Sequence, residues 1–355
     1  MDQVFLKLCN VVIKVETNNK DYLQYLLFYF KDIVQDPAVV TEVELNLIVK
    51  WVSKRKWKEK LSDQRKNMIA VGGHTFVIDR EVSFVRKIKR KIIFSLISDS
   101  NHQNGYAYII EKKAKDYVKY KLLRKPEEEF FFELTYPLIY YPLFWYLEQR
   151  HNKYLLHASA FESKGKGIII CGLEGIGKTT LSLALNSTGS DQFLSDNLVL
   201  HDMQYAYGCY ELLRLHSGED KELWDGKFSQ VNEFRTVKNF YRPKISTTGK
   251  VDVDIVLFPS FGQQYNVTQL TAIAASNKAV RLSYLARELE HYFQYRNVYA
   301  LLEPNSFLIE QQRKSFLQLI RNAMCYEVVM RKEDGFWENV SKVKEVLSKG
   351  HHYGN

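Results

Sequence analysis

The sequence predicts an α/β fold preceded by a smaller, mostly β (α+β) domain, and three observations support this prediction. The chain has 355 residues, of which 46% are hydrophobic, so it is long enough for two domains and has enough apolar side chains for two cores. Residues 1–128 contain short β-branched and aromatic runs separated by turns. Residues 167–185 contain a short apolar run, a glycine-rich loop and the first turns of a buried helix. We therefore expect one domain over residues 1–128 and a second over residues 129–355.

The elements of the first part follow from local side-chain patterns. Two glycines interrupt the apolar run over residues 69–78, which predicts a hairpin. Apolar residues over 21–30 recur at the spacing of one helix. Because this part holds no grouping of residues typical of catalysis, we expect it to recognise a partner or to serve in packing. Other β-branched or aromatic runs predict strands at residues 11–13, 92–97 and 106–110.

The net positive charge of the chain limits the kinds of binding partner that we expect. The net charge is 50 − 41 = +9, and much of it lies at residues 54–56 and 86–91. A basic surface can attract nucleic acid, acidic peptides or phosphates, or it can be an ordinary solvated lysine face. No nucleic-acid-binding motif accompanies these residues, so we expect no nucleic-acid partner, and an acidic peptide would suit the charge.

Neither the cysteines nor the apolar runs indicate an extracellular or membrane protein. The four cysteines lie far apart without paired spacing, which predicts no disulfide framework, no zinc site and a reducing, cytoplasmic environment. The first residues lack the apolar core of a signal peptide. Residues 130–147 are strongly apolar, but Glu133, Pro137 and Pro142 interrupt them, so we expect buried helices and no membrane span.

The second part alternates strands and helices, which is typical of an α/β domain. A strand over residues 154–161 turns at 163–166 directly into the apolar run at 168–171. Residues 193–200 are predicted to form a strand interrupted by polar residues, and residues 216–250 are polar and rich in loops. The remaining predictions are strands at 205–215, 251–259, 270–274 and 325–330, and helices at 137–150, 279–292, 307–324 and 334–347.

Residues 172–179 fit the pattern G-x-x-x-x-G-K-[ST] at every fixed position. Glycines let the backbone come close to phosphate oxygens, and successive N–H groups at the positive end of the next helix form a cradle for anions. In such a loop Lys178 reaches the β- and γ-phosphates and the Thr179 hydroxyl binds Mg²⁺. The flanking strand and helix make a chance glycine-rich turn the weaker interpretation. The predicted nucleotide-binding residues are Gly172, Leu173, Glu174, Gly175, Ile176, Gly177, Lys178, Thr179 and Thr180.

Residues outside the glycine-rich loop distinguish between the classes of enzyme that bind nucleotides. A GTPase is expected to carry N/T-K-x-D, and the nearest match at residues 277–280 lacks the aspartate. A motor-type ATPase is expected to end an apolar strand in Asp-Glu, whereas the run over 253–258 is followed by proline. A carboxylate does follow the loop at Asp196, and His157 precedes Lys178 by 178 − 157 = 21 residues. An aspartate beside the γ-phosphate can take the proton of an attacking hydroxyl, as in other phosphotransferases.

Three segments, His157-Ala-Ser-Ala, the loop GLEGIGKTT and Leu194-Ser-Asp-Asn, together resemble the HPr kinase/phosphorylase superfamily, whose catalytic core is similar to the nucleotide domain of phosphoenolpyruvate carboxykinases. The resemblance covers residues 150–260 and, more loosely, the residues after them. Within the superfamily the chain looks most similar to kinase-like proteins of peptide-modification clusters, including lasso-peptide precursor kinases. The resemblance implies a P-loop kinase core of this type, ATP and Mg²⁺ as cofactors and, since HPr kinases assemble as oligomers, a homo-oligomer.

Carried over residue by residue, the resemblance implies roles for individual side chains. His157 matches the superfamily's active-site histidine near the phosphates. Lys178 and Thr179 match its phosphate-binding lysine and metal-ligating hydroxyl. Asp196 matches the first of its paired aspartates, and the second position is Asn197 here, so Asp196 is the carboxylate left to act as base.

The other matches are less specific. Glu211 resembles the glutamate that completes the Mg²⁺ site in a Glu-Ile-Arg-Gly segment, but the glycines expected after Arg214 are absent, which argues against the reverse phosphorylase reaction. Lys250 stands where a Pro-Gly-Arg-Asn loop has its arginine, and Arg235 and Arg242 are further candidates for a clamp on the moving phosphoryl group. Each site residue also has a purely structural alternative: a core histidine, a turn-capping aspartate, a strand glutamate, and solvated charges at the clamp positions.

Together these residues predict ATP-dependent phosphoryl transfer to a serine or threonine hydroxyl of a protein or precursor peptide. In this interpretation Asp196 accepts the hydroxyl proton, Lys178 neutralises developing charge and His157 steadies the γ-phosphate. Two alternatives stay open, because resemblance at the level of the fold determines chemistry better than substrate. One is a kinase for an amino acid or other metabolite hydroxyl. The other is a nucleotide-gated binding module with little transfer activity, with which the missing second aspartate is compatible.

Overall fold

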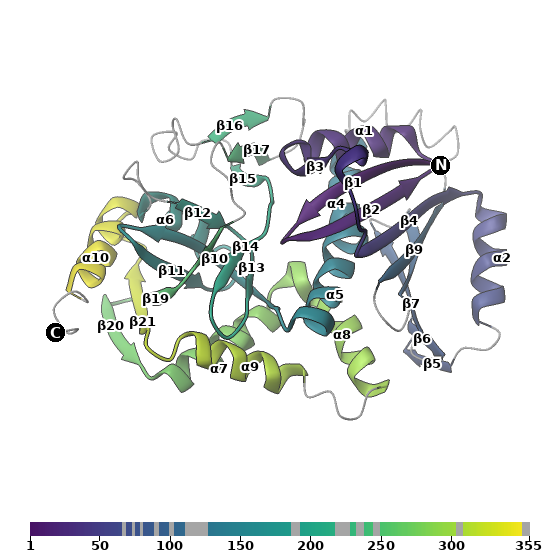
Figure 1. The fold of residues 1–355 in the computed structure, drawn as a ribbon. Coiled ribbons are helices and arrows are strands. Elements are labelled where there is room, and N and C mark those ends of the chain that lie inside the picture. Colours follow the sequence, from purple (N-terminus) through teal and green to yellow (C-terminus); the bar gives the residue numbers. More distant parts are fainter. Residues whose placement is uncertain are drawn as a thin grey trace. The chain divides into compact units, whose positions relative to one another are not determined.

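The computed structural model describes residues 1–65, 69–72, 75–78, 81–88, 92–98, 103–110, 127–185, 192–216, 228–231, 238–243, 249–302 and 308–349. Internal contacts divide the chain into two compact units, each of which combines β-sheet with helices, so the predicted mixed α/β class is confirmed (Figure 1). Residues 129–152 belong to unit 1, whereas the sequence prediction joined them to the second domain; the functional division at residue 128 stays a prediction. Unit 1 comprises Met1–Asn152, Asn232–Asn239 and Gln294–Asn305, and unit 2 comprises Lys153–Val231, Phe240–Phe293 and Ser306–Asn355.

Unit 1 is built on a mixed sheet with the strand order β3-β1-β2-β4-β9-β8-β7-β6-β5. β2, β4 and β9 run parallel, and the other neighbouring pairs run antiparallel, including the predicted β5–β6 hairpin. Burial alternates residue by residue along β2 and β4, as expected when one face of each strand packs on a core. The strands are β1 (Asp2–Leu8), β2 (Val11–Thr17), β3 (Val34–Gln35), β4 (Leu45–Val52), β5 (Ile69–Gly72), β6 (Thr75–Ile78), β7 (Glu81–Ile88), β8 (Ile92–Ser98) and β9 (Asn104–Ile110).

The helices of unit 1 include the strongly apolar run that the sequence placed in buried helices. Residues 130–147 are buried almost throughout, and the two prolines lie within the π-helical turn and the first turn of the helix after it. Among the described residues, no helix combines the length and apolar character needed to cross a membrane. The helices are α1 (Lys20–Tyr29), α2 (Lys54–Arg65), α4 (Glu127–Thr135) and α5 (Tyr141–His151), with the short turns η1 (Lys31–Ile33), η2 (Pro37–Val39) and the π-helical η3 (Tyr136–Tyr140).

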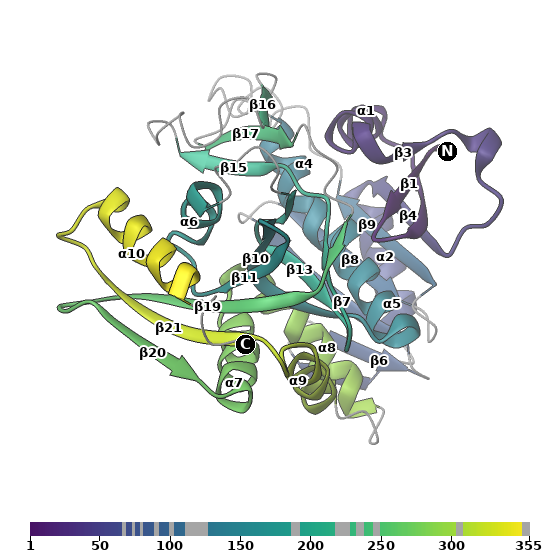
Figure 2. The same cartoon turned by 60° about the vertical axis from the view of Figure 1, so that its left-hand side comes forward.

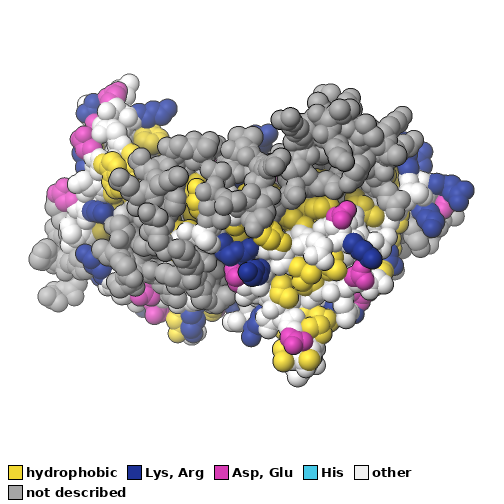
Figure 3. Space-filling view, turned by 90° about the horizontal axis from the view of Figure 1, so that it is seen from above, with side chains coloured by type: hydrophobic (Ala, Val, Ile, Leu, Met, Phe, Trp, Pro, Cys, Tyr) yellow, Lys and Arg dark blue, Asp and Glu magenta, His cyan; other side chains and the backbone are white. Residues whose placement is uncertain are grey.

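The basic segment at residues 54–56 lies on α2. Trp57 is buried against Val52 and Tyr108, whereas the lysines and arginine before it are exposed. Figure 3 shows Lys and Arg side chains grouped at the end of the face where α2 lies and scattered elsewhere on the described surface. A solvated face anchored by one tryptophan accounts for this segment.

Unit 2 is built on a second mixed sheet with the order β18-β14-β13-β10-β11-β19-β21-β20, in which β12 also pairs with β10. β11, β19 and β21 run parallel, so their carboxyl ends meet at one edge, where ligands bind in open α/β sheets. A small sheet, β15-β17-β16, completes the unit. The strands are β10 (Tyr154–Ser163), β11 (Lys166–Cys171), β12 (Gln192–Ser195), β13 (Leu198–His201), β14 (Ala206–Gly208), β15 (Leu213–His216), β16 (Phe228–Val231), β17 (Lys238–Pro243), β18 (Lys250–Val251), β19 (Val253–Gly262), β20 (Asn266–Leu270) and β21 (Met324–Arg331).

Helices cover both faces of this sheet, with α6 and α10 on one face and α7 and α9 on the other (Figures 1 and 2). Alternate residues of β11 enter the two resulting cores: Ile168 and Ile170 pack on the α6 side, and Ile169 and Cys171 pack on the α7 side. A strand buried on both faces is continuously apolar, which is why this run stood out in the sequence. The helices are α6 (Lys178–Leu185), α7 (Ala272–Tyr284), η5 (Arg287–Leu289), α8 (Glu290–Leu302), α9 (Leu308–Leu319) and α10 (Phe336–Lys349); α8 continues into unit 1.

Most predicted elements of the second part are present, but four boundaries were wrong. The helix predicted at 307–324 ends at Leu319, and Met324 already begins β21. The strand predicted at 270–274 ends at Leu270, because Thr271 caps α7 by accepting a hydrogen bond at Oγ1 from the Ala274 N–H (3.2 Å). The helix predicted at 279–292 is divided by η5 between α7 and α8. The strand predicted at 205–215 is interrupted between β14 and β15, where Glu211 lies.

Candidate functional site

The glycine-rich loop, residues 172–179, connects β11 to α6 at the carboxyl edge of the parallel strands. Gly175 and Gly177 have φ values of +80° and +85°, a region that residues with a Cβ rarely adopt. A Cβ on Gly172 would lie 2.8 Å from Cγ2 of Ile176. The path of the loop therefore requires its glycines, and residues 173–175 are exposed, so a ligand can reach the loop.

Lys178 is the first residue of α6 and is 5% exposed. Its Nζ donates a hydrogen bond to the carbonyl oxygen of Leu173 (3.1 Å), so the side chain curls over its own loop. Burial lowers the pKa of Lys178, while the nearby carboxylates of Asp196 and Glu288 raise it. The ammonium group thus lies between the loop backbone and two acidic side chains.

Asp196 lies in the polar interruption between β12 and β13, both of which pair with β10. The Ser159 hydroxyl on β10 is within hydrogen-bond distance of both the main-chain oxygen (2.7 Å) and Oδ1 (3.0 Å) of Asp196. Burial raises the pKa of Asp196, whereas hydrogen bonds from Thr179 and Ser159 and the Lys178 cation oppose that rise. The structure therefore brings the predicted base next to both predicted phosphate- and metal-binding side chains.

His157 lies on β10 and is 3% exposed. Its backbone N–H donates to Oγ of Ser283 on α7 (3.0 Å), and its ring donates to the backbone of Gly172 in the loop. Burial, with help from the Lys178 and Arg214 cations, lowers the pKa of His157 to about 4. Nδ1 is buried and has no hydrogen-bond partner among the described residues. At neutral pH the ring is uncharged, and Nδ1 is its remaining acceptor.

Glu211, in the segment between β14 and β15, and Arg214, on β15, extend this cluster. Arg214 Nη2 lies 3.7 Å from Glu211 Oε1 and donates to both oxygens of Glu288, at 2.9 and 3.1 Å. Glu288 belongs to η5 and influences the pKa of both His157 and Lys178. The resulting site cluster contains two cations and three carboxylates: Lys178, Arg214, Asp196, Glu211 and Glu288.

Sequence reasoning missed Glu288 and Ser283 and gave Ser159 no role of its own. Glu288 is 74 residues from its partner Arg214, and Ser283 is 126 residues from His157. No local motif surrounds either of them. Only Ser159 carried a signal in the sequence. It lies two residues after His157 on a predicted strand, so both side chains point to the same face.

The predicted clamp residues have partners elsewhere in unit 2 or lie outside the described residues. Arg242 donates to the Tyr210 hydroxyl (2.5 Å), and Nζ of Lys250 lies 3.7 Å from the centre of the Tyr205 ring. Arg235 lies outside the described residues. The clamp role of these three residues stays a prediction.

Among the described residues, no group of three or more His, Cys, Asp or Glu side chains is arranged to hold a metal ion. The predicted Mg²⁺ ligands, Thr179 and Glu211, do not require such a group of three side chains. Magnesium in nucleotide sites takes one or two protein ligands and completes its shell with phosphate oxygens and water. The donor set around Asp196 suits that arrangement, since Thr179 hydrogen bonds to this carboxylate.

Comparison with protein-family models and with curated proteins found no match to this chain.

Proposed function

We propose that this protein catalyses ATP-dependent phosphoryl transfer to a serine or threonine hydroxyl of a protein or peptide, on a core of the HPr kinase type. The observation that carries the proposal is the buried carboxylate of Asp196 beside the end of the glycine-rich loop, where it accepts a hydrogen bond from Thr179 and interacts with the charge of Lys178. The motif resemblance to the HPr kinase/phosphorylase superfamily supports the same interpretation. The identity of the acceptor rests on that resemblance alone.

The loop and the site cluster fit a nucleotide with Mg²⁺. Gly175 and Gly177 hold the positive φ values, and the exposed loop backbone can offer N–H groups to phosphates. Three carboxylates against two cations would repel a bare triphosphate, so a divalent cation is needed to complete the charge balance. Thr179 and Glu211 would hold that cation. ATP with Mg²⁺ supplies an activated phosphoryl group and neutralises its charge.

Asp196 is suited to accept the proton of the acceptor hydroxyl. A carboxylate whose pKa is raised by burial is, in its ionised form, a stronger base than a solvated carboxylate. Ser159 fixes Oδ1, which limits how the carboxylate can turn. Lys178 stays close enough to counter negative charge as it develops.

The geometry around His157 modifies its expected role. A neutral imidazole that donates to Gly172 presents Nδ1 as an acceptor, so it cannot donate a hydrogen bond to a phosphate without first taking a proton. Nδ1 is instead suited to receive a hydrogen bond from the attacking hydroxyl, whose proton Asp196 takes. We assign His157 this accepting role beside Asp196.

The test is transfer from γ-labelled ATP with Mg²⁺ in extract of the source organism, with products separated into polypeptide, small-molecule and free-phosphate fractions. Asp196→Asn should lower labelling about 100-fold or more while nucleotide binding is kept, since loss of a general base typically has this effect. Asp202→Asn is the matched control. Asp202 accepts hydrogen bonds from the Gln204 and Tyr205 N–H groups elsewhere in unit 2, so this variant should keep transfer.

Label on a polypeptide that depends on Asp196 supports the proposal and identifies the acceptor. Label on a small molecule would replace it with a metabolite kinase. Free phosphate alone, or no label above the Asp196→Asn background, would favour the nucleotide-gated binding module. Undiminished labelling by Asp196→Asn would show that the base is another group.

A further inference from the structure

A pocket lies directly against the glycine-rich loop. Its volume is about 220 Å³, and its lining includes Ile176, Gly177 and Thr180 from the loop and α6. The opposite wall comes from the ends of β19 and β21 and from the start of α10. The site cluster does not account for this pocket.

The loop thus presents two different sides. Lys178 and Thr179 face the acidic side chains of the site cluster, whereas Ile176 and Thr180 face the pocket. The pocket also lies at the carboxyl ends of the strands parallel to β11, the edge at which open α/β sheets bind ligands. A ligand with phosphates in the loop and a further group attached to them could place that group here.

The pocket wall is mainly apolar and aromatic, with Lys332 as the charged residue in its lining. Phe261, Met330 and Phe336 line it, and Phe261 is 43% exposed although it is a large hydrophobic residue. Its volume is below the roughly 300–1,000 Å³ typical of pockets for whole ligands, so it suits one ring system. Flat nucleobases stack on aromatic side chains of this kind.

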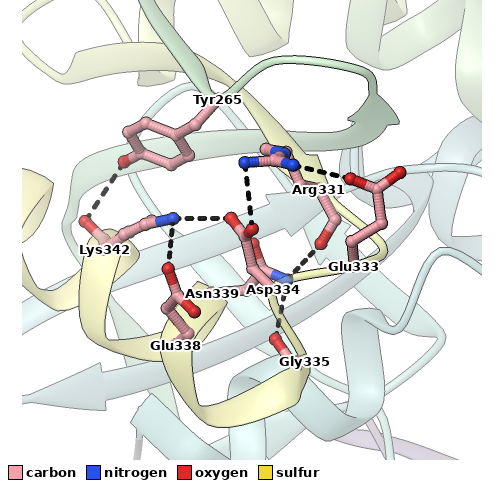
Figure 4. Close-up of polar contacts among 8 residues, drawn as sticks. All are labelled: Tyr265, Arg331, Glu333, Asp334, Gly335, Glu338, Asn339 and Lys342. Carbon is pink, nitrogen blue, oxygen red and sulfur yellow. Dashed lines mark hydrogen bonds and ion pairs between the residues drawn. The ribbon is translucent and has the colours of Figure 1, made fainter.

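One polar group at the pocket has unused hydrogen-bonding capacity. Asn339 is 6% exposed and donates through Nδ2 to the carbonyl oxygens of Arg331 (2.7 Å) and Gly335 (2.8 Å) (Figure 4). Because both neighbours are acceptors, the amide nitrogen must face them, which fixes the orientation of the side chain. Its Oδ1 is buried and accepts no hydrogen bond from the described residues. A buried acceptor of this kind calls for a donor.

Ion pairs hold this wall in place. Arg331 pairs with Glu333 (2.6 Å) and with Asp334 (3.4 Å), and Lys342 pairs with Asp334 (2.5 Å) and Glu338 (2.8 Å). Figure 4 shows these side chains bridging the turn from β21 to α10, beside Asn339. These ion pairs brace the turn that leads into α10, the helix that carries Asn339, before any ligand arrives, which favours binding by preorganisation.

We propose that this pocket seats the base of the bound nucleotide and that the base is adenine; the inference rests on the proposed function. Phe261 and Phe336 provide the stacking surface. The 6-amino group of adenine is a donor suited to Asn339 Oδ1, whereas guanine has a carbonyl acceptor at the same position. The glycine-rich loop then holds the phosphates, and the pocket selects which nucleotide supplies them.

The test is calorimetric titration of the full chain with the Mg²⁺ complexes of ATP, GTP, purine riboside triphosphate and tripolyphosphate. ATP should bind about tenfold or more tightly than tripolyphosphate, as expected for one stacked base. GTP and purine riboside triphosphate, which lack the 6-amino donor, should bind more weakly than ATP. Phe336→Ala and Phe261→Ala should weaken ATP binding toward that of tripolyphosphate and leave tripolyphosphate binding unchanged, which also shows that the variants are folded.

Ile273→Ala is the matched control, because Ile273 is another exposed apolar side chain of unit 2 that does not line the pocket. It should change neither affinity. Equal affinities for ATP and tripolyphosphate, or a preference for ATP that both phenylalanine variants preserve, would overturn the base pocket while the loop remains a phosphate site. A purine riboside triphosphate affinity equal to that of ATP would overturn the role of Asn339 and the assignment to adenine. Failure of both ATP and tripolyphosphate to bind would overturn the proposed function itself.

Discussion

Each unit buries charged side chains, but it does so in a different way. In unit 1, Glu148 on α5 and Arg296 on α8 are each 1% exposed, and Oε2 and Nε are 2.8 Å apart. In unit 2, the site cluster gathers five charged side chains and an uncharged histidine beside an exposed loop. The first group, the closed pair, lies within a core that a ligand does not reach. The second is adjacent to a loop that a ligand can reach. Burial of charge therefore does not by itself identify a site, and access to a ligand makes the difference.

The closed pair should give the largest effect on stability. Arg296→Met removes the cation that pairs with the buried Glu148 carboxylate, and we expect the free energy of unfolding to fall by about 3–5 kcal/mol. Denaturant unfolding measures this change. The double variant with Glu148→Leu should be more stable than the single variant, because it removes the uncompensated charge. A loss below about 1 kcal/mol in the single variant would show that the pair is not isolated from solvent.

The second largest effect is a pH dependence that comes from His157. Its pKa is about 4 in the folded chain against 6.5 as a model value, so between these values the unfolded chain binds more protons. The stabilisation is complete above pH 6.5 and is lost as the pH falls toward 4, by about 3 kcal/mol in total at 1.36 kcal/mol for each pKa unit. The difference in unfolding free energy between wild type and His157→Gln should therefore shrink as the pH falls from 6.5 toward 4. A difference that does not vary with pH would mean that the ring is not held neutral.

The open cluster should tolerate the loss of one charge better than the closed pair. Glu288→Gln keeps an acceptor for Arg214, and Glu211 remains nearby to balance the guanidinium. We expect the free energy of unfolding to fall by about 1 kcal/mol, in the same denaturant experiment as Arg296→Met. A loss as large as that of Arg296→Met would remove the distinction between the two groups, and the cluster would then be a structural unit.

The smallest effect is expected at Lys250, which the sequence placed in a phosphate clamp. Its ammonium group lies over Tyr205 on the exposed side of β18, so Lys250→Ala should cost at most about 1 kcal/mol of stability. Transfer in the labelled-ATP assay should be unchanged. A large loss of transfer with stability intact would restore Lys250 as a clamp and extend the site beyond the described cluster.

Local patterns predicted much of unit 2. The apolar run at 168–171 had to be a buried strand, and the glycine-rich loop after it could be recognised because its residues are consecutive. Asp196 stood out as the polar break in an apolar run, and the structure places it between β12 and β13. The strand predicted over 270–274 was wrong because short apolar stretches do not distinguish a strand from the first turn of a helix, which Thr271 decides by capping.

By itself the sequence determined the strand, loop and helix around residues 172–179, the proximity of Lys178 and Thr179, and the alternation that puts His157 and Ser159 on one strand, because these depend on neighbours in the chain. Only the tertiary structure decided that Glu288 approaches Arg214, that Ser283 holds the backbone of His157, and that Asn339 lines a pocket beside the loop. The physical reason is that residues distant in sequence meet only when sheet order and helix packing bring them together, and no local spacing encodes that order.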